Sequence, residues 1–154
     1  MPKLKNQTVG FRSFIKTSTH SKLTFEYHHL SEFRRGGNKL NRPPHEADIA
    51  EQLQHTINSG GAKFDYFSPD EKQRLSVYAS AQHTGRDSYY GGGQDVNAYG
   101  ATTDFTWVTG SQYIYSFDKC FFMPADFTGG LEYNQDNLTD DMWAVSYTHL
   151  TLPT

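Results

Sequence analysis

Alternating apolar and polar positions run along most of this chain and predict an all-β protein. The clearest unit has two alternating arms, residues 62–66 and 74–82, on either side of Ser68-Pro69-Asp70. Proline presets φ for the second position of a type I turn, and Ser and Asp bond locally to turn backbone. The pattern therefore predicts an antiparallel hairpin with one apolar and one polar face. Its apolar positions are Ala62, Phe64, Tyr66, Leu75, Val77, Ala79 and Ala81.

The same period of two predicts four further strands around this hairpin, at residues 8–15, 22–30, 105–117 and 127–134. Short breaks at residues 18–21 and 68–72, and a proline turn at residues 123–126, join the strands in pairs. Longer polar, glycine-rich segments at residues 32–48 and 85–103 are expected to be loops.

Residues 47–57 leave two interpretations open. Ile49, Leu53 and Ile57 recur every four residues after Pro43-Pro44, which is typical of an amphipathic helix. All three are also odd-numbered, so a strand would place them on one face. We favour the strand, because its neighbours are strands. The apolar positions then switch from odd to even numbers beyond Gly60-Gly61, which predicts a β-bulge there.

The order of the breaks carries further information about the fold. Short and long connections alternate along the chain, and alternate connections of an antiparallel meander lie at opposite ends of the sheet. We therefore expect all short turns at one end and all long loops at the other. Bacterial outer-membrane barrels have this asymmetry, with short periplasmic turns and longer extracellular loops.

Composition narrows the functional classes. The 154 residues predict one domain, and 14 basic against 17 acidic residues offer no basic field for nucleic acid. The mean hydropathy is −0.71 although aromatic residues make up 15%, a mixture typical of a sheet with one apolar and one wetted face. The sequence contains no run of about 18 apolar residues, so no transmembrane helix is predicted. Cys120 is the single cysteine, which excludes an internal disulfide.

The first eleven residues, MPKLKNQTVGF, are charged and lack the apolar core of a signal peptide. A secreted or outer-membrane protein needs such a peptide. We therefore expect the chain to be either intracellular or a piece of a longer protein.

Candidate binding residues lie in the two long polar segments. Arg34 and Arg35 could bind an anionic ligand with paired N–H donors, or could be solvated loop charges. The stretch with Arg86, Asp87, Tyr89 and Tyr90 offers aromatic stacking and hydrogen bonds, or could form an interfacial aromatic girdle.

Metal and catalytic sites are not predicted. His45 lies beside Glu46 and near Asp48, but this spacing matches no standard zinc motif. The adjacent His28 and His29 point to opposite faces of a strand, so they cannot share an ion. The sequence holds no nucleophile–base set, phosphate-binding loop or dinucleotide fingerprint, so neither an enzyme nor a cofactor is expected.

Six segments carry a family resemblance when they are read together. They are HSKLTFEYHHLSEFRRGGN, RPPHEADIAEQLQHTINSGG, KFDYFSPDEKQRLSVYASAQHTGRDSYYGG, DVNAYGATTDFT, DKCFFMPAD and GGLEYN. Over roughly residues 5–142 the chain resembles the middle of the barrel domain of a TonB-dependent outer-membrane receptor. Nothing in it matches the plug domain, the TonB-contacting box or the last barrel strand of that family.

The resemblance implies an open, curved section of about six strands from a 22-stranded transmembrane barrel. Such receptors import scarce nutrients such as siderophores, cobalamin or glycans. The implied partners are the outer-membrane bilayer, the plug domain of the full-length receptor, the inner-membrane TonB system and a small nutrient ligand. The implied ligand contacts on extracellular loops are Arg34, Arg35, His45, Arg86, Asp87, Tyr89 and Tyr90.

The resemblance also implies which side chains face lipid and which face the lumen. The expected lipid-facing residues are Leu23, Phe25, Phe64, Tyr66, Leu75, Val77, Trp107, Tyr113 and Tyr115. The expected lumen-facing residues are Lys22, Glu26, Lys63, Asp65, Arg74 and Gln82.

The last residues, 144–154, do not continue the family pattern. Their stretch SYTHLTLPT resembles translated sequencing-adapter read-through, so we assign the barrel segment to residues 1–143.

A second class of protein stays open: a soluble secreted β-sandwich binding module, with Trp107 and the tyrosine stretch as carbohydrate platforms. The two classes differ in the place of Phe64, Tyr66, Leu75 and Val77. A sandwich buries these four side chains under a second sheet, whereas a barrel section leaves them bare.

Overall fold

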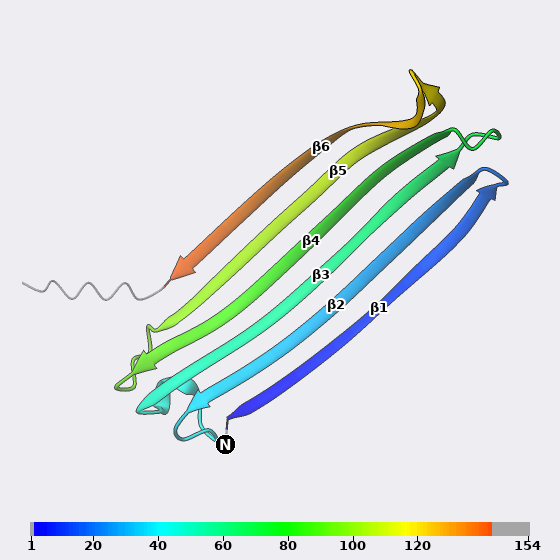
Figure 1. Cartoon of the computed structure of the whole chain (residues 1–154). Helices are drawn as coiled ribbons and strands as arrows, with labels where there is room; N and C mark the ends of the chain where they lie inside the picture. Colours follow the sequence, from blue (N-terminus) through cyan, green and yellow to red (C-terminus); the bar gives the residue numbers. More distant parts are fainter. Residues whose placement is uncertain (1, 143–154) are drawn as a thin grey trace, which may run out of the picture.

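The computed structural model describes residues 2–142, which form one six-stranded antiparallel sheet in the order β1-β2-β3-β4-β5-β6 (Figure 1). The strands are β1 (Lys3–Ser18), β2 (Ser21–Gly37), β3 (Ile49–Phe67), β4 (Gln73–Gly92), β5 (Tyr99–Cys120) and β6 (Met123–Met142). A three-residue 3-10 helix, η1 (Pro44–Glu46), precedes β3. The predicted all-β meander of six strands is confirmed.

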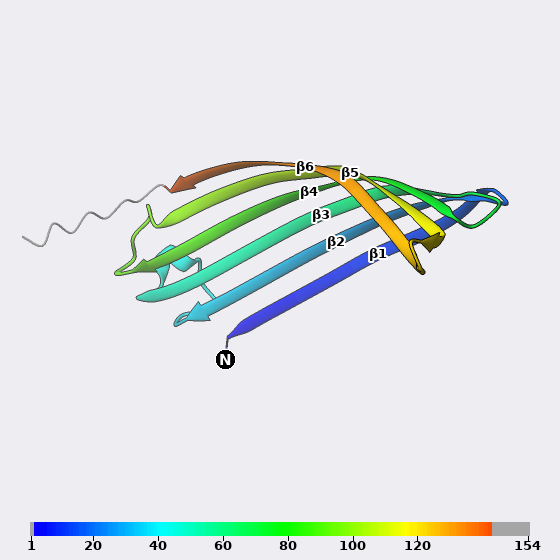
Figure 2. The ribbon, with the colours of Figure 1, turned by 45° about the horizontal axis from the view of Figure 1, so that its top comes forward.

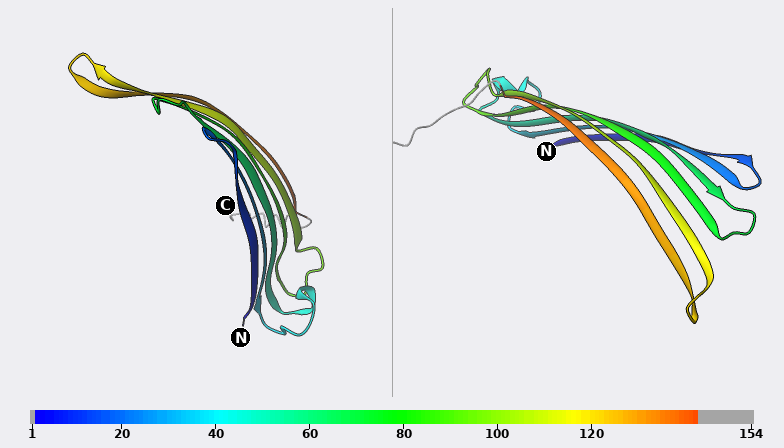
Figure 3. Two further views of the ribbon diagram at one scale, coloured as in Figure 1. Left: turned by 90° about the vertical axis from the view of Figure 1, so that its right-hand side faces the viewer. Right: turned by 90° about the horizontal axis from the view of Figure 1, so that it is seen from above.

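The sheet is open. Each strand pairs with its neighbours along the chain, which leaves β1 and β6 as the two edges. The strands lie side by side in one layer (Figure 2) and arch along their length without bringing the edges together (Figure 3). Among the described residues no helix is long and apolar enough to cross a membrane. The assignment of residues 144–154 to a tail lies outside the described residues.

Every strand is longer than the sequence pattern predicted, with lengths from 16 residues in β1 to 22 in β5. Much of the two segments expected to be loops therefore belongs to strands. Residues 32–37 extend β2, residues 85–92 extend β4, and β5 begins at Tyr99. The prediction of these boundaries was wrong. Backbone pairing continues beyond the last alternating apolar side chains, so the hydrophobic period does not mark where a strand ends.

The connections separate by length, as expected. Residues 19–20, 68–72 and 121–122 join strands at one end of the sheet, while residues 38–48 and 93–98 join them at the other. At the first end the backbone N–H of Phe67 donates to the carbonyl of His20 at 2.7 Å, which ties two neighbouring turns together. We call these ends the short-turn rim and the long-loop rim.

Two of the short turns show how the sequence shapes this rim. In the predicted turn at residues 68–72, Ser68 bonds to the Asp70 carboxylate and its hydroxyl accepts from the Gln73 N–H at 2.9 Å. The proline turn expected at residues 123–126 was wrong: Met123 begins β6, and the turn is residues 121–122. Pro124 is accommodated because it falls in the register shift between the Cys120–Met123 and Phe117–Ala125 pairs, where it has no pairing partner.

Residues 49–67 form one continuous strand, which confirms the strand interpretation over the helix. The predicted bulge at Gly60-Gly61 was wrong. Gly60 pairs with Tyr27 and Ala81 in a register that runs through β2, β3 and β4 without a shift.

The odd-to-even switch has a different cause. Leu53 and Ile57 lie on the same face as Lys63 and Asp65, opposite Phe64. The face that carries Phe64 is apolar near the short-turn rim and becomes polar toward the long-loop rim. The apolar residues of β3 therefore lie on this face near the short-turn rim and on the opposite face nearer the long-loop rim.

Register and alternation place all nine expected lipid-facing side chains on one face of the sheet, which we call the apolar face. These are Leu23, Phe25, Phe64, Tyr66, Leu75, Val77, Trp107, Tyr113 and Tyr115. The six expected lumen-facing residues share the opposite, polar face, with Gln82 above Lys22, Glu26, Lys63, Asp65 and Arg74. Apolar-face side chains remain exposed: Val77 is 43% exposed, Phe11 61% and Leu131 82%.

Aromatic side chains border this apolar region. Phe11, Tyr27 and Trp107 belong to one transverse row of paired residues that crosses the sheet through Gly60 and Ala81. Nearer the short-turn rim, Tyr66 and Tyr113 flank Leu75 in a second row. We call the region between the two rows the apolar band.

The buried hydrophobic residues of the described part lie at the long-loop rim. Ala47, which follows η1, packs with Ala50 and Tyr89, and all three are at most 3% exposed. The β2–β3 loop thus folds onto the sheet beyond the apolar band, on the same face.

Candidate functional site

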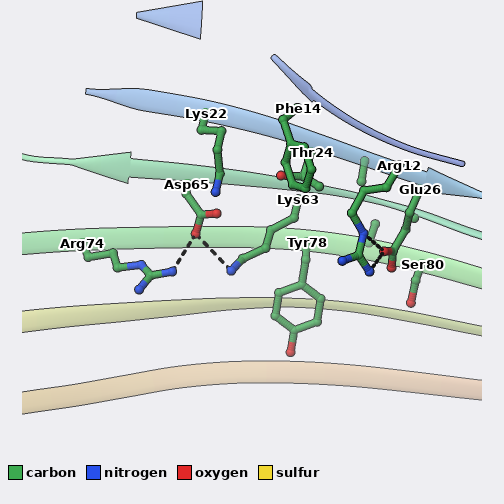
Figure 4. Close-up of a pocket in the computed structure, with 13 residues that line it drawn as sticks. Arg12, Phe14, Lys22, Thr24, Glu26, Lys63, Asp65, Arg74, Tyr78 and Ser80 are labelled. Carbon is green, nitrogen blue, oxygen red and sulfur yellow. Dashed lines mark hydrogen bonds and ion pairs between the residues drawn. The ribbon is translucent and has the colours of Figure 1, made fainter. Parts of the chain in front are cut away.

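A cluster of charged side chains on the polar face surrounds a hollow of about 430 Å³ near the short-turn rim. Figure 4 shows its lining, which comes from β1, β2, β3 and β4. The lining includes Arg12, Lys22, Glu26, Lys63, Asp65, Arg74 and Tyr78.

Asp65 is the centre of this cluster. Its carboxylate is almost fully buried and accepts a 2.6 Å hydrogen bond from the Ser76 hydroxyl. Lys63 approaches the same oxygen at 3.1 Å and Arg74 at 3.3 Å (Figure 4). A buried carboxylate needs such partners, because an uncompensated charge out of water is strongly unfavourable. Asp65 therefore fixes two cations from adjacent strands in one place.

A second pair lies beside it. Arg12 on β1 donates to one carboxylate oxygen of Glu26 on β2, from Nε at 2.9 Å and from Nη2 at 2.6 Å. Lys22 lies over the ring of Phe14, with Nζ 5.7 Å from the ring centroid. These contacts hold the Arg12 guanidinium and the Lys22 ammonium group over the polar face of the sheet.

The hollow carries more positive than negative charge. Four cations line it, Arg12, Lys22, Lys63 and Arg74, against two carboxylates, Glu26 and Asp65. Such a surface can bind a polar or anionic partner through N–H donors. Its side chains are engaged in ion pairs rather than arranged as a nucleophile and a base.

At the long-loop rim, some predicted binding residues lie on the apolar-face side. The Nδ1 of His45 lies 2.8 Å from the Tyr99 hydroxyl, and the Tyr99 ring packs edge-on against Tyr89 at 4.8 Å between centroids. The Tyr89 hydroxyl donates to the carbonyl of Asp95 at 2.9 Å, and burial raises the pKa of this phenol. Tyr89, at 1% exposed, anchors the loops and is not open to a ligand, whereas Tyr99 remains exposed.

Arg35 and Asp87 lie on the same face. Arg35 is 3% exposed, and its Nη1 donates to the Gly36 carbonyl at 3.4 Å, while Nη2 has no hydrogen-bond partner within residues 2–142. Asp87 pairs in register with Gln54 and Ala101. Arg35 is therefore a structural residue beneath the β2–β3 loop.

The other predicted binding residues lie on the polar face at the same rim. Arg34 pairs with Glu32 at 2.6 Å, and Arg86 donates from Nη2 to the Tyr90 hydroxyl at 3.3 Å. Tyr90 is exposed. The structure thus divides the predicted set between the two faces and brings together only Arg86 and Tyr90 by direct contact.

Asp48 joins the two long loops. Its carboxylate accepts from Lys39 Nζ at 2.7 Å and from Asn38 Nδ2 at 2.9 Å, and its carbonyl accepts from the N–H of Gly93 at 2.8 Å. The hydrogen bond from Lys39, followed by that from Asn38, holds the pKa of the Asp48 carboxyl below its usual value. His45 contacts Tyr99 instead, so the two side chains have different partners.

Sequence reasoning missed Tyr99 and Lys39 as contact residues. Both lie in segments expected to be loops, where neither alternation nor a motif indicated a partner. Groups of three or more metal-ligating side chains are absent from the described part of the chain. His29 lies on the apolar-face side, with Nδ1 2.8 Å from Asn58 Oδ1, while its neighbour His28 points to the polar face.

The sequence matches no protein-family model and no curated protein sequence.

Proposed function

We propose that this sheet is a section of the 22-stranded barrel of a TonB-dependent outer-membrane receptor, which imports a scarce nutrient of the siderophore, cobalamin or glycan class. The observation that carries the proposal is the apolar band. It extends from β1 to β6 on one face, interrupted at β5 by Thr109 and Ser111, and stays exposed, with aromatic rows at its borders. Membrane β-strands present such a band to lipid, flanked by aromatic girdles at both interfaces.

The strand lengths support the same proposal. Strands in globular proteins usually have about 3–10 residues, whereas a strand that crosses a bilayer obliquely needs about 9–11 residues. All six strands here have at least 16 residues. A tilted span can therefore fit within each strand and leave residues beyond the band at the long-loop rim.

In this proposal the polar face lines the lumen. The cluster around Asp65 and Arg12 would contact the plug domain of the full-length receptor near its periplasmic end. Arg34, Arg86 and Tyr90 share this face at the long-loop rim, so they are the proposed ligand contacts. Arg35, His45, Asp87 and Tyr89 lie on the opposite face and are better explained as anchors of the rim.

Quenching by brominated lipids tests the membrane contact. Substituting Trp143→Phe leaves Trp107, on the apolar face, as the single tryptophan. When the chain is reconstituted in vesicles with brominated acyl chains, we expect strong quenching of Trp107 together with a β-sheet circular dichroism spectrum. A folded, water-soluble chain with unquenched Trp107 would instead indicate the β-sandwich module and would refute the proposal.

Paired arginine substitutions refine this test. Val77→Arg places a charge in the apolar band and is expected to destabilise the inserted sheet by about 2–4 kcal/mol. Gln82→Arg, on the polar face of the same strand, is the matched control and should have little effect. Equal effects of the two substitutions would contradict a one-sided contact with lipid.

The receptor assignment has its own test in the DNA around the gene. An open reading frame that continues upstream of Met1 into a plug domain would support it. We also expect no discrete, stable pores from this chain alone in a liposome conductance assay, because known single-chain barrels begin at about eight strands.

A further inference from the structure

The two edge strands carry opposite charge. β1 contains four basic residues and no acidic one: Lys3, Lys5, Arg12 and Lys16. β6 contains five acidic residues and no basic one: Asp126, Glu132, Asp136, Asp140 and Asp141. Segregation of this kind is not needed for the pairing seen within the sheet, because β1 and β6 do not contact each other.

Both edges are open. β1 pairs only with β2, and β6 pairs only with β5, so each has one side on which its backbone N–H and C=O groups lack a strand partner within residues 2–142. Such an edge is a template for another strand. β1 is exposed along its whole length, and Phe11 and Leu131 are bare on the two edges.

We propose that β1 of one chain pairs with β6 of a second copy, edge to edge. The strand count allows this, because with six strands in a meander β1 and β6 run in opposite directions. Antiparallel pairing of β6 with the next β1 therefore continues the meander. It keeps the apolar faces on one side and the short-turn rims at one end.

Charge decides between this arrangement and its alternatives. Pairing β1 with another β1 would place basic residues against basic residues, and pairing β6 with β6 would place acids against acids. Like charges directly across a strand pair are destabilising, whereas opposite charges contribute roughly 0.2–1 kcal/mol a pair. The head-to-tail contact alone brings the two signs together.

The spacing of charges on the polar face fits one contact especially well. Arg12 and Lys16 are separated by four residues, as are Glu132 and Asp136. A register that places Arg12 opposite Asp136 therefore also places Lys16 opposite Glu132. Arg12 already pairs with Glu26 within its own chain, so this contact would extend an existing ion pair across the edge.

A head-to-tail contact between unlike edges is heterologous, so it propagates into rings or open chains rather than stopping at a dimer. The inference depends on the edges alone and not on contact with lipid. Within a longer barrel the same edges would meet strands of that chain.

Charge-reversal variants test the contact in a non-ionic detergent that covers the apolar face. One variant carries Arg12→Glu and Lys16→Glu on β1, and the other carries Glu132→Lys and Asp136→Lys on β6. These are the four residues that the proposed register places in opposite-charge pairs. Sedimentation velocity at low ionic strength should show multimers of the unmodified chain and roughly tenfold weaker association of each variant alone.

The mixture of the two variants gives the sharpest outcome. Each variant alone presents two edges of like charge. In an equimolar mixture the two intact edges are complementary, and so are the two reversed edges, so the mixture should regain multimers in which the variants alternate. Hydrogen exchange should slow at both edge strands of each component.

The matched control, Arg42→Glu with Lys119→Glu, changes the net charge as the β1 variant does but leaves both edges intact. It should associate like the unmodified chain. A monomeric unmodified chain, an equal loss in this control, or a mixture that stays monomeric would each overturn the proposal.

Discussion

Ser76 donates a 2.6 Å hydrogen bond to Asp65 across the β3–β4 pair, and the Asp65 side chain is only 3% exposed. Asp65→Ala would leave this hydroxyl and the heads of Lys63 and Arg74 without their acceptor. Because both cations can still reach water, we expect the free energy of unfolding to fall by about 1–3 kcal/mol. Denaturant titration in detergent, followed by circular dichroism, measures this change.

Two further variants make the Asp65 prediction specific. Asp65→Asn keeps an oxygen that can accept from Ser76, so its loss should be smaller than that of Asp65→Ala. Asp126→Ala, an exposed carboxylate on β6, should change the free energy of unfolding little. A loss of the same size in Asp126→Ala would show that general charge, rather than this contact, matters.

Gly37 ends β2 with φ of +97°, a conformation that L side chains rarely adopt, and a Cβ there would lie 2.1 Å from the Ile49 carbonyl oxygen. Gly37→Ala should therefore destabilise the long-loop rim by at least about 1–3 kcal/mol. Gly36→Ala is the matched control, because nothing lies within 4 Å of a Cβ at that position. Limited proteolysis of residues 38–48 reads out the difference, and equal cleavage of the two variants would contradict the prediction.

Acid should loosen the contact between the two long loops. The hydrogen bond from Lys39, with that from Asn38, lowers the pKa of Asp48 in the folded chain. A lowered carboxyl pKa contributes stability that is fully present above the unfolded value near 4 and is lost as pH falls through the folded value. Asp48→Asn should thus increase hydrogen exchange of the Gly93 amide at pH 6, and this effect should shrink progressively as the pH is lowered below about 4. An effect that does not depend on pH would refute this account.

Tyr89 should be required as an anchor rather than as a ligand contact. Its ring is 1% exposed, and its hydroxyl donates to the Asp95 carbonyl. Tyr89→Phe removes that bond and should cost about 1 kcal/mol, whereas Tyr89→Ala also leaves a cavity and should cost about 3–5 kcal/mol. Thermal unfolding checks both values. Tyr90→Phe, at an exposed position, should be close to neutral.

Much of this fold was predictable from the period of two. The apolar face of the central hairpin, with Phe64 and Val77 on one side and Lys63 on the other, follows from alternation alone. The separation of short turns from long loops followed from the order of the breaks. Strand ends did not, because at Gly85–Gly92 the two tyrosines are adjacent and lie on opposite faces among polar residues and glycines, so no period of two appears.

The candidate site was predictable only in part. The sequence placed Arg34 and Arg35 together in an expected loop, whereas they lie on opposite faces of β2, and only the contacts of the folded chain show that Arg35 is buried while Arg34 pairs with Glu32. The bulge expected at Gly60-Gly61 failed for a related reason. The polarity of a side chain depended both on which face it occupies and on how far along the strand it lies. A change in the alternation of apolar residues can reflect either cause, so the sequence pattern alone does not distinguish a bulge from a change of environment.

The even number of strands has a consequence for how such proteins can change in evolution. The described chain starts and finishes at the same rim, so a block of three hairpins has matching entry and exit points. Duplication or deletion of a gene segment encoding such a block would enlarge or shrink a sheet without turning any other strand upside down. Each neighbour would keep its inner and outer sides, which makes this unit suitable for recombination.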